Sequence, residues 1–310
     1  MLSYKRVLMA VPYRYVNEET VKQGVSFARH HQAHLTLFGV VEEVDRAYEQ
    51  WLTTKLPREL EQDTKTRQLA ALQERVDRIK PDYPNVDCAV SVGIPFVEII
   101  RQIKSGGYDL LILDAVSHQP GHKRFMGSTA KHVLRKCPSP VLCVRDNHPY
   151  RKIVAAVDVF SSKEQIQSLN TKVMHHAYGL AQQEGAELHV VYAQQPIGEP
   201  MLSSWGIGSA DMLDGMEAEL IASAKEKMQQ LVRQTCGSTE GIQLKTVLGN
   251  ARDALPLYVK EENIDLITMG TVCRTGIKGF LIGNTAESIL DEVDCSILAL
   301  KPEGFETTVE

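Results

Sequence analysis

The sequence predicts an α/β protein with two tandem doubly wound, parallel five-stranded sheets and helices on both faces of each. Three observations predict it. The chain of 310 residues repeats itself. Each half alternates short apolar runs with segments of helical period, and a glycine-rich segment follows the fourth apolar run of the second half. Short, nearly continuous apolar strands between helices are typical of a parallel sheet covered on both sides.

The repeat is visible in three pairs of segments. They are Tyr4–Val11 with Tyr150–Val157, Tyr108–Leu113 with Ile264–Met269, and Gly127–Ala130 with Gly283–Ala286. A repeat of this length indicates two domains. We place domain 1 at residues 1–147, domain 2 at 150–304 and a tail at 305–310.

The elements follow from hydrophobic periodicity. Continuous apolar runs predict first-half strands near Val7–Val11, Leu35–Val41, Cys88–Val92, Leu110–Leu113 and Val141–Val144. The same signal predicts second-half strands at Lys152–Val159, Leu188–Tyr192, Leu244–Leu248, Leu266–Met269 and Ile297–Leu300. Apolar residues at helical spacing predict helices over Leu169–Glu184, Asp211–Val232, Ala251–Glu262 and Thr285–Val293.

Composition excludes several functional classes. The net charge is −5 and the charges are interspersed, which argues against direct nucleic-acid or membrane-surface binding. No apolar run is long enough to span a membrane, and the N-terminal run does not resemble a signal peptide. The six cysteines form no C-x-x-C pair or metal-ligand spacing, so we expect reduced cysteines, a cytoplasmic protein and no metal site.

The segment after the fourth strand of the second half suits a phosphate group. It contains four glycines, Gly270, Gly276, Gly279 and Gly283, and it leads into a helix. Glycine lets the backbone approach a ligand closely, and a helix N-terminus presents free N–H groups to an anion. Ligands of doubly wound sheets bind beyond the carboxyl ends of the strands, where this segment begins.

This segment resembles the signature of the universal stress protein family, G-x-x-G, nine residues, then G-S or G-T. Gly270 and Gly283 occupy the outer glycines, whereas Cys273 replaces the middle one and Asn284, followed by Thr285, replaces the Ser/Thr. Further features resemble the E branch of the family. These are Gly-Thr-Val-x-Arg-Thr-Gly-Ile, Gly-Asn-Thr-Ala-Glu, Lys301-Pro302 and Leu134–Val141.

The resemblance implies a stress-response binding and regulatory protein rather than an enzyme, with a role in stress and DNA damage resistance. It implies an adenine nucleotide, ATP or AMP, with no metal except the Mg²⁺ that accompanies ATP. The implied contact residues are Val157, Asp158, Val190, Met269, Gly270, Cys273, Gly283, Asn284 and Thr285. Asp158 would recognise the adenine or ribose side, Val190 would line the base, and Arg274 and Lys278 could add charge.

The first half departs from the pattern. Pro12 replaces the acidic residue, Asp114 and Ser117 replace two glycines, and only Gly127-Ser128 survives. A carboxylate repels a phosphate by about 1 kcal/mol or more at contact even in water. We therefore expect any nucleotide in the second domain. By the same resemblance, the domains would form an intrachain pseudo-dimer through Val141–Val144 and Ile297–Leu300, and the chain could form a homodimer.

Simpler interpretations remain open for several residues. Asn284 with Glu287, and Ser128, could be ordinary helix caps, and Asp158 could cap a turn. Ser105–Asp109 resembles the start of a pyrophosphatase loop but precedes the wrong strand, and His30, His31 and His34 lack a carboxylate at ligand spacing.

Two other functions also remain open. The protein could act through protein partners or a small apolar ligand, with Gln195–Ala210 as a lid and Trp51 and Trp205 as pocket covers. It could also be a slow ATPase, although no catalytic base is placed.

Overall fold

The computed structural model describes residues 2–13, 16–43, 57–115, 126–145, 149–195, 210–271 and 283–309. The chain divides into two compact units. Residues 3–145 and 306–309 belong to the first, and residues 149–271 and 283–305, with Leu2, belong to the second. Within the predicted tail, the Val309 carbonyl accepts a 2.9 Å hydrogen bond from Lys104 Nζ.

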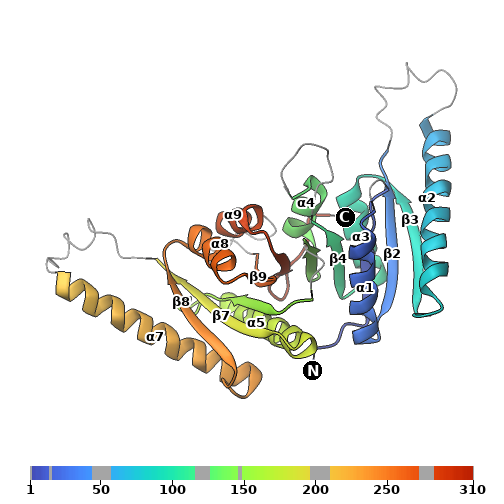
Figure 1. The fold of residues 1–310 in the computed structure, drawn as a ribbon. Coiled ribbons are helices and arrows are strands. Elements are labelled where there is room, and N and C mark those ends of the chain that lie inside the picture. Colours follow the sequence, from blue (N-terminus) through green and yellow to red (C-terminus); the bar gives the residue numbers. More distant parts are fainter. Residues whose placement is uncertain are drawn as a thin grey trace. The chain divides into compact units, whose positions relative to one another are not determined.

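In the first domain, strands and helices alternate. The elements are β1 (Arg6–Ala10), α1 (Glu18–His31), β2 (His34–Val41), α2 (Pro57–Ile79), β3 (Val86–Val92), α3 (Pro95–Gly106), β4 (Leu110–Asp114), α4 (Ser128–Lys136) and β5 (Val141–Val144). The strand order is β3-β2-β1-β4-β5, and the neighbouring strands are parallel. Figure 1 shows α2 running beside β3.

The second domain repeats this plan. Its elements are β6 (Lys152–Ala156), α5 (Glu164–Glu184), β7 (Glu187–Gln194), α7 (Ala210–Cys236), β8 (Ile242–Leu248), α8 (Ala251–Glu261), β9 (Leu266–Gly270), α9 (Asn284–Glu292) and β10 (Ser296–Leu300). The order is β8-β7-β6-β9-β10, again parallel. Helix α5 packs against α7, and α8 packs against α9 (Figure 1).

The predicted fold class is confirmed, and each predicted strand is present. The largest errors lie at the start of the second domain, where β6 ends at Ala156 rather than Val159 and α5 begins at Glu164 rather than Leu169. The strand ends early because the Asn170 side chain, not a neighbouring strand, binds the backbone of Asp158. The pairing of the fifth strands and the pseudo-dimer stay predictions.

The proposed helix caps were wrong. Ser128 and Asn284 are the first helical residues of α4 and α9, and Gly127 and Gly283 are the N-caps, with extended backbone and no side-chain hydrogen bond. A glycine N-cap leaves the first N–H groups of the helix without the side-chain acceptor that Ser or Asn would supply.

The Ser105–Asp109 segment has a structural role. Gly107 ends α3 in the left-handed conformation (φ 61°), and its N–H donates to the Ile103 carbonyl. The Asp109 carboxylate accepts N–H groups of Lys5 and Arg6 at 2.7 and 3.0 Å. Asp265 repeats this arrangement in the second domain, accepting from Arg151 and Lys152 at 2.8 and 2.9 Å. Each aspartate thus fixes the start of the central strand of its sheet.

We expect Asp265→Ala to lower the free energy of unfolding of the second domain by about 3 kcal/mol. The reason is that two hydrogen bonds to a charged acceptor are lost, at the weaker end of their range because they are partly exposed. Urea unfolding measures the change. The matched control is Asp253→Ala, which removes a carboxylate that is 70% exposed in the same domain. An equal loss in the two variants would contradict this role.

The described histidines have polar and structural neighbours. Contrary to expectation, His34 has a carboxylate partner, because its Nε2 lies 3.0 Å from Asp87 Oδ2 of β3, and its Nδ1 lies 2.8 Å from Asn85 Oδ1. Among the residues that the structure describes, no three His, Cys, Asp or Glu side chains are grouped as metal ligands. Within those residues there is also no helix long and apolar enough to cross a membrane.

Candidate functional site

The carboxyl ends of the strands of the second domain meet at one edge, and strand order reverses between β6 and β9. Ala156 pairs with Met269, so Val157 and Asp158 leave the sheet beside Gly270 and Thr271. On the other side of β9, Leu300 pairs with Gly270, which brings Lys301 to the same edge. This switch point is where doubly wound sheets bind ligands.

Asp158 is held in place by Asn170 of α5. The Asn170 side-chain oxygen accepts the Asp158 N–H at 3.0 Å, and its side-chain nitrogen donates to the Asp158 carbonyl at 2.8 Å. Asn170 is only 7% exposed, so this clamp is largely shielded from water. The Asp158 backbone is therefore fixed while its half-buried side chain lies at the edge.

Gly270 is the last residue of β9, and the Leu169 side chain of α5 packs against it. A Cβ atom built on Gly270 would lie 2.4 Å from Leu169 Cδ2 and 2.9 Å from its Cγ. Leu169 is 5% exposed and part of the core. The glycine is thus required by packing between α5 and β9, whether or not a ligand approaches the same backbone.

The N-terminus of α9 faces this edge, because a helix that connects parallel strands β9 and β10 must begin at their carboxyl ends. The first intrahelical hydrogen bond runs from the Glu287 N–H to the Gly283 carbonyl at 3.0 Å. Helix geometry leaves the N–H groups of Asn284, Thr285 and Ala286 without intrahelical acceptors, and the helix dipole adds a partial positive charge. Gly283 is buried and Thr285 is exposed.

A buried lysine, Lys301, binds Thr271 at the start of the glycine-rich segment. Lys301 is 3% exposed, and its Nζ donates to the Thr271 hydroxyl at 2.7 Å and to the Thr271 carbonyl at 3.3 Å. It also lies 5.0 Å from the centre of the Phe305 ring. Lys172 Nζ of α5 donates to the Lys301 carbonyl at 3.0 Å. Burial lowers the pKa of Lys172, and the charge of Glu303 partly opposes this shift.

Val190 does not lie at this edge. It pairs with Ala155 in the middle of β7 and is fully buried. The same register places Tyr192 and Ala193 beside Val157 and Asp158. β7 continues to Gln194, and a contact between Val190 and the base, which the family resemblance implies, stays a prediction.

Tyr192 belongs to an aromatic pair that sequence reasoning missed. Its ring centre lies 5.4 Å from that of Phe160, which is 37% exposed and lies two residues after Asp158. Lys227 Nζ of α7 lies 5.3 Å from the Phe160 ring centre. The available signal was an aromatic residue, Phe160, four residues beyond the end of β6.

Several predicted site residues lie outside the described residues. These are Cys273, Arg274, Gly276, Lys278 and Gly279, with Trp51, Trp205, Ser117 and residues 196–209 of the predicted lid. The structure therefore brings together Val157, Asp158, Met269, Gly270 and the Gly283–Thr285 start of α9.

The corresponding edge of the first domain has different chemistry. Pro12 is exposed after β1, and Asp114 ends β4 where Gly270 ends β9. Gly127 caps α4 as Gly283 caps α9. The first domain thus retains the helix N-terminus but places a carboxylate beside it.

Three comparisons relate the chain to known proteins. The model of the "Universal stress protein family" matches residues 3–145 and 149–301. Universal stress protein E of Escherichia coli strain K12 is 31% identical over 222 residues, covering 70% of this chain and 68% of that protein. The universal stress protein E of Photorhabdus laumondii is 24% identical over 332 residues, covering 100% of this chain and 99% of that protein.

Solved structures show the same fold. A protein of unknown function from Pseudomonas aeruginosa PAO1 aligns with a TM-score of 0.71 and 23% identity, covering 97% of this chain and 94% of that chain. A universal stress protein from Archaeoglobus fulgidus DSM 4304 aligns with a TM-score of 0.64 and 17% identity, covering 95% of this chain and 98% of that chain.

Proposed function

The chain belongs to the universal stress protein family, and from this membership we propose that it is a stress-response protein whose second domain binds an adenine nucleotide, ATP or AMP. One observation carries the proposal. Asp158, whose backbone is held by Asn170, and the glycine-capped N-terminus of α9 belong to the same edge of one sheet, at its switch point. A nucleotide needs both a polar acceptor for its sugar or base and a donor site for its phosphates.

The residues present fit such a ligand. The Asp158 carboxylate would accept a ribose hydroxyl or the adenine amine, and Asn170 fixes the backbone that carries this side chain. The free N–H groups of α9 would donate to phosphate oxygens, and the dipole favours their charge. The buried ammonium of Lys301 would lower the cost of bringing phosphates to Thr271. The Phe160–Tyr192 pair offers an apolar wall beside Asp158.

We propose that the protein binds the nucleotide without turning it over. Asp158 is the acidic group argued to face the ligand, and Asn170 holds its backbone for binding rather than for proton transfer. Magnesium would accompany ATP as part of the ligand. We place the protein in the cytoplasm, because Cys88, Cys137, Cys143, Cys236 and Cys295 are free thiols.

A second candidate function has one observation in its favour. Leu169 packing fully accounts for Gly270, so that glycine would be retained in a protein whose pocket holds another small ligand or acts through protein partners. The exposed Phe160 would suit an apolar group.

Titration calorimetry with ATP and with AMP separates these candidates. We expect one site per chain, and we expect Asp158→Asn to weaken it about tenfold or more, since a hydrogen bond to a charged acceptor is lost. Asp253→Asn, in the same domain and 70% exposed, is the matched control and should bind normally. We also expect no phosphate release from ATP above a heat-inactivated sample.

Equal affinity in wild type and Asp158→Asn would refute the assignment of Asp158. Heat signals that are absent for both nucleotides at millimolar concentration would favour the second candidate. Phosphate release above the inactivated sample would make the protein an ATPase and contradict the proposal of binding alone.

A further inference from the structure

A groove between α1 and α2 of the first domain has no place in the function proposed above. Its volume is about 300 Å³. The lining residues come from two helices and the turn that follows the second: Glu18, Val21, Lys22, Val25, Ser26, Arg29, Arg75, Arg78, Ile79 and Asp82. In the second domain the equivalent helices, α5 and α7, pack against each other. The α1–α2 groove is therefore described for the first domain alone.

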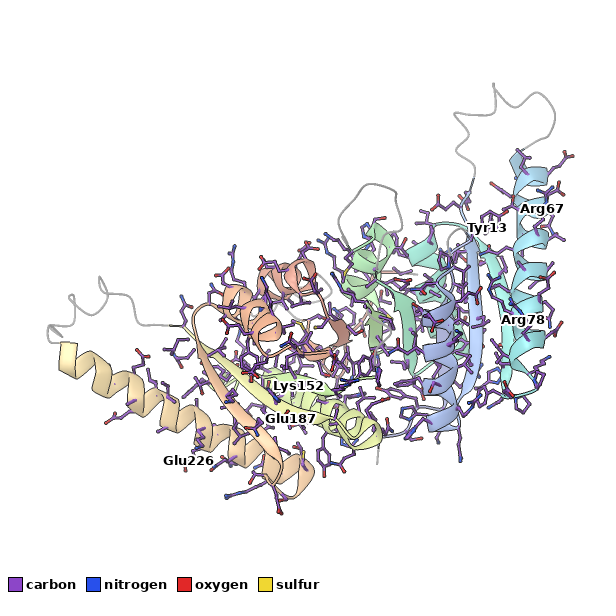
Figure 2. The ribbon with its side chains drawn as sticks, in the orientation of Figure 1. Tyr13, Arg67, Arg78, Lys152, Glu187 and Glu226 are labelled. Carbon is purple, nitrogen blue, oxygen red and sulfur yellow. The ribbon has the colours of Figure 1, made fainter. Side chains whose placement is uncertain are left out.

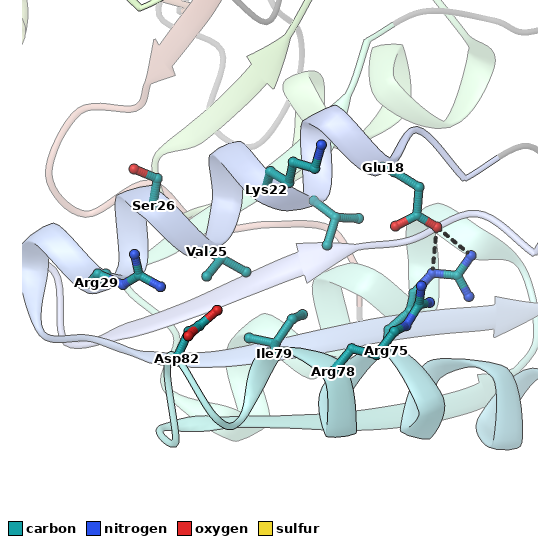
Figure 3. A pocket seen from close by; sticks show the side chains of 10 residues that line it. Glu18, Lys22, Val25, Ser26, Arg29, Arg75, Arg78, Ile79 and Asp82 are labelled. Atoms are coloured by element: carbon teal, nitrogen blue, oxygen red, sulfur yellow. Dashed lines mark hydrogen bonds and ion pairs between the residues drawn. The ribbon is translucent and has the colours of Figure 1, made fainter.

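The groove has an apolar floor. Figure 3 shows Val25 of α1 and Ile79 of α2 pointing toward one another across it. Val25 is 9% exposed and Val21 is 5% exposed, so both belong to the core. A ligand that covered this floor would gain about 25 cal/mol for each Å² of apolar surface removed from water.

Basic side chains dominate the groove. Four of its lining residues are basic and two are acidic, in a chain whose net charge is −5. At one end Glu18 accepts from Arg75 Nη2 at 2.9 Å and from Arg75 Nε at 3.2 Å (Figure 3). This ion pair links the start of α1 to α2 and fixes the width of the groove there. At the other end Arg29 and Asp82 flank the opening (Figure 3).

Guanidinium groups recognise oxyanions with a planar fork of donors, and the groove presents them from both helices. Arg29 and Arg78 are both exposed, and Arg78 Nε makes a long bond of 3.4 Å to the Glu74 carbonyl. Each therefore retains donors for a ligand. The volume corresponds to about ten water molecules at about 30 Å³ each, which suits a compact molecule.

We propose that the α1–α2 groove of the first domain binds a small organic oxyanion, a phosphate or carboxylate joined to an apolar body. The oxyanion binds Arg29 and Arg78, and the apolar body lies on Val21, Val25 and Ile79. The site is independent of the nucleotide edge, since it lies in the other domain and uses none of that site's residues.

The test follows backbone amide signals by NMR while the full-length protein is titrated with defined probes. Phenyl phosphate and benzoate carry both parts of the ligand, inorganic phosphate carries only the anion, and benzyl alcohol carries only the ring. We expect at least one of the two complete probes to shift signals of α1 and α2 around the groove, with a dissociation constant on the order of 1 mM. Phosphate and benzyl alcohol should bind about tenfold more weakly or not at all. The stronger of the two complete probes identifies the anion.

The variant Arg29→Gln/Arg78→Gln should abolish these shifts while leaving the spectrum of the rest of the domain unchanged. Arg67→Gln is the matched control, because Arg67 is exposed on the same helix as Arg78 but does not line the groove (Figure 2). Three results would each overturn the proposal: no shift with either complete probe at 10-fold the expected constant, binding of inorganic phosphate as strong as that of the complete probes, or equal loss of binding in Arg67→Gln.

Discussion

Lowering the pH from 7 to 5 should destabilise each domain by up to about 2 kcal/mol through one buried histidine. In the first domain this is His31, which is 8% exposed and whose pKa is lowered to about 4, mainly by burial and then by the neighbouring His30, while Asp109 opposes the shift. In the second it is His176, also 8% exposed, whose pKa is lowered to about 3 by burial and then by Lys172 and His175.

The direction of this change in stability follows from which state, folded or unfolded, binds the proton more readily. A folded-state pKa below the unfolded value of about 6.5 means that the unfolded chain takes up the proton first as the pH falls. The neutral imidazole therefore contributes stability above about pH 6.5, and this stability is lost as the pH falls toward the folded pKa. At pH 5 the unfolded histidine is almost fully protonated and the folded one is almost fully neutral.

Urea unfolding at pH 5, 6, 7 and 8 measures this loss. The variants His31→Gln and His176→Gln should each reduce the pH dependence of their own domain. Between pH 7 and 8, where both states hold a neutral imidazole, the difference between variant and wild type should be constant. The assignment would be contradicted if the free energy of unfolding changed equally between pH 5 and 7 in wild type and in the double variant His31→Gln/His176→Gln.

Gly270→Ala should lower the free energy of unfolding of the second domain by about 2–3 kcal/mol, because the new methyl group overlaps the buried Leu169 side chain. The loss depends on that single neighbour. Leu169→Ala alone should cost about 2–5 kcal/mol by leaving a cavity. In the double variant the added methyl group occupies space that Leu169 vacates.

A double-mutant cycle therefore tests the contact. The two losses should be clearly less than additive, with a coupling of about 1 kcal/mol or more. The control cycle combines Gly270→Ala with Met228→Ala, where Met228 is a buried residue of α7. The losses in the free energy of unfolding from these two substitutions should be additive. Additive losses for Gly270 and Leu169 would show that the glycine serves some purpose other than packing against α5.

The sheet was predictable because its strands carry a strong local signal. Continuous apolar runs such as Leu266–Met269 are buried on both faces, and they mark a parallel strand wherever they occur. The ends of helices and strands were harder to predict from the sequence. The limit of β6 depends on a side chain twelve residues away, Asn170, whose importance appears only when α5 packs beside the strand. In the sequence, Asn170 stands out only as a polar residue within the apolar stripe of a helix.

The candidate site was predictable only in part, for a related reason. Asp158 and Gly270 could be placed at one edge, since strand ends follow from the strands. Val190 was assigned from the family resemblance alone, and the register of β7 places Tyr192 and Ala193, rather than Val190, beside Val157 and Asp158. Lys301 could not be linked to Thr271 from sequence, because they are thirty residues apart and meet only through the pairing of β9 with β10.

Native mass spectrometry of the purified protein tests the central claim most directly. We predict that ATP or AMP, either retained on purification or added at millimolar concentration, adds the mass of one nucleotide per chain. At a nucleotide concentration near the wild-type dissociation constant, Asp158→Asn should strongly reduce the fraction of chains that carry this mass, while Asp253→Asn should preserve it. No mass addition with either nucleotide, or an addition that Asp158→Asn leaves unchanged, would contradict a nucleotide site at the edge formed by β6, β9 and α9.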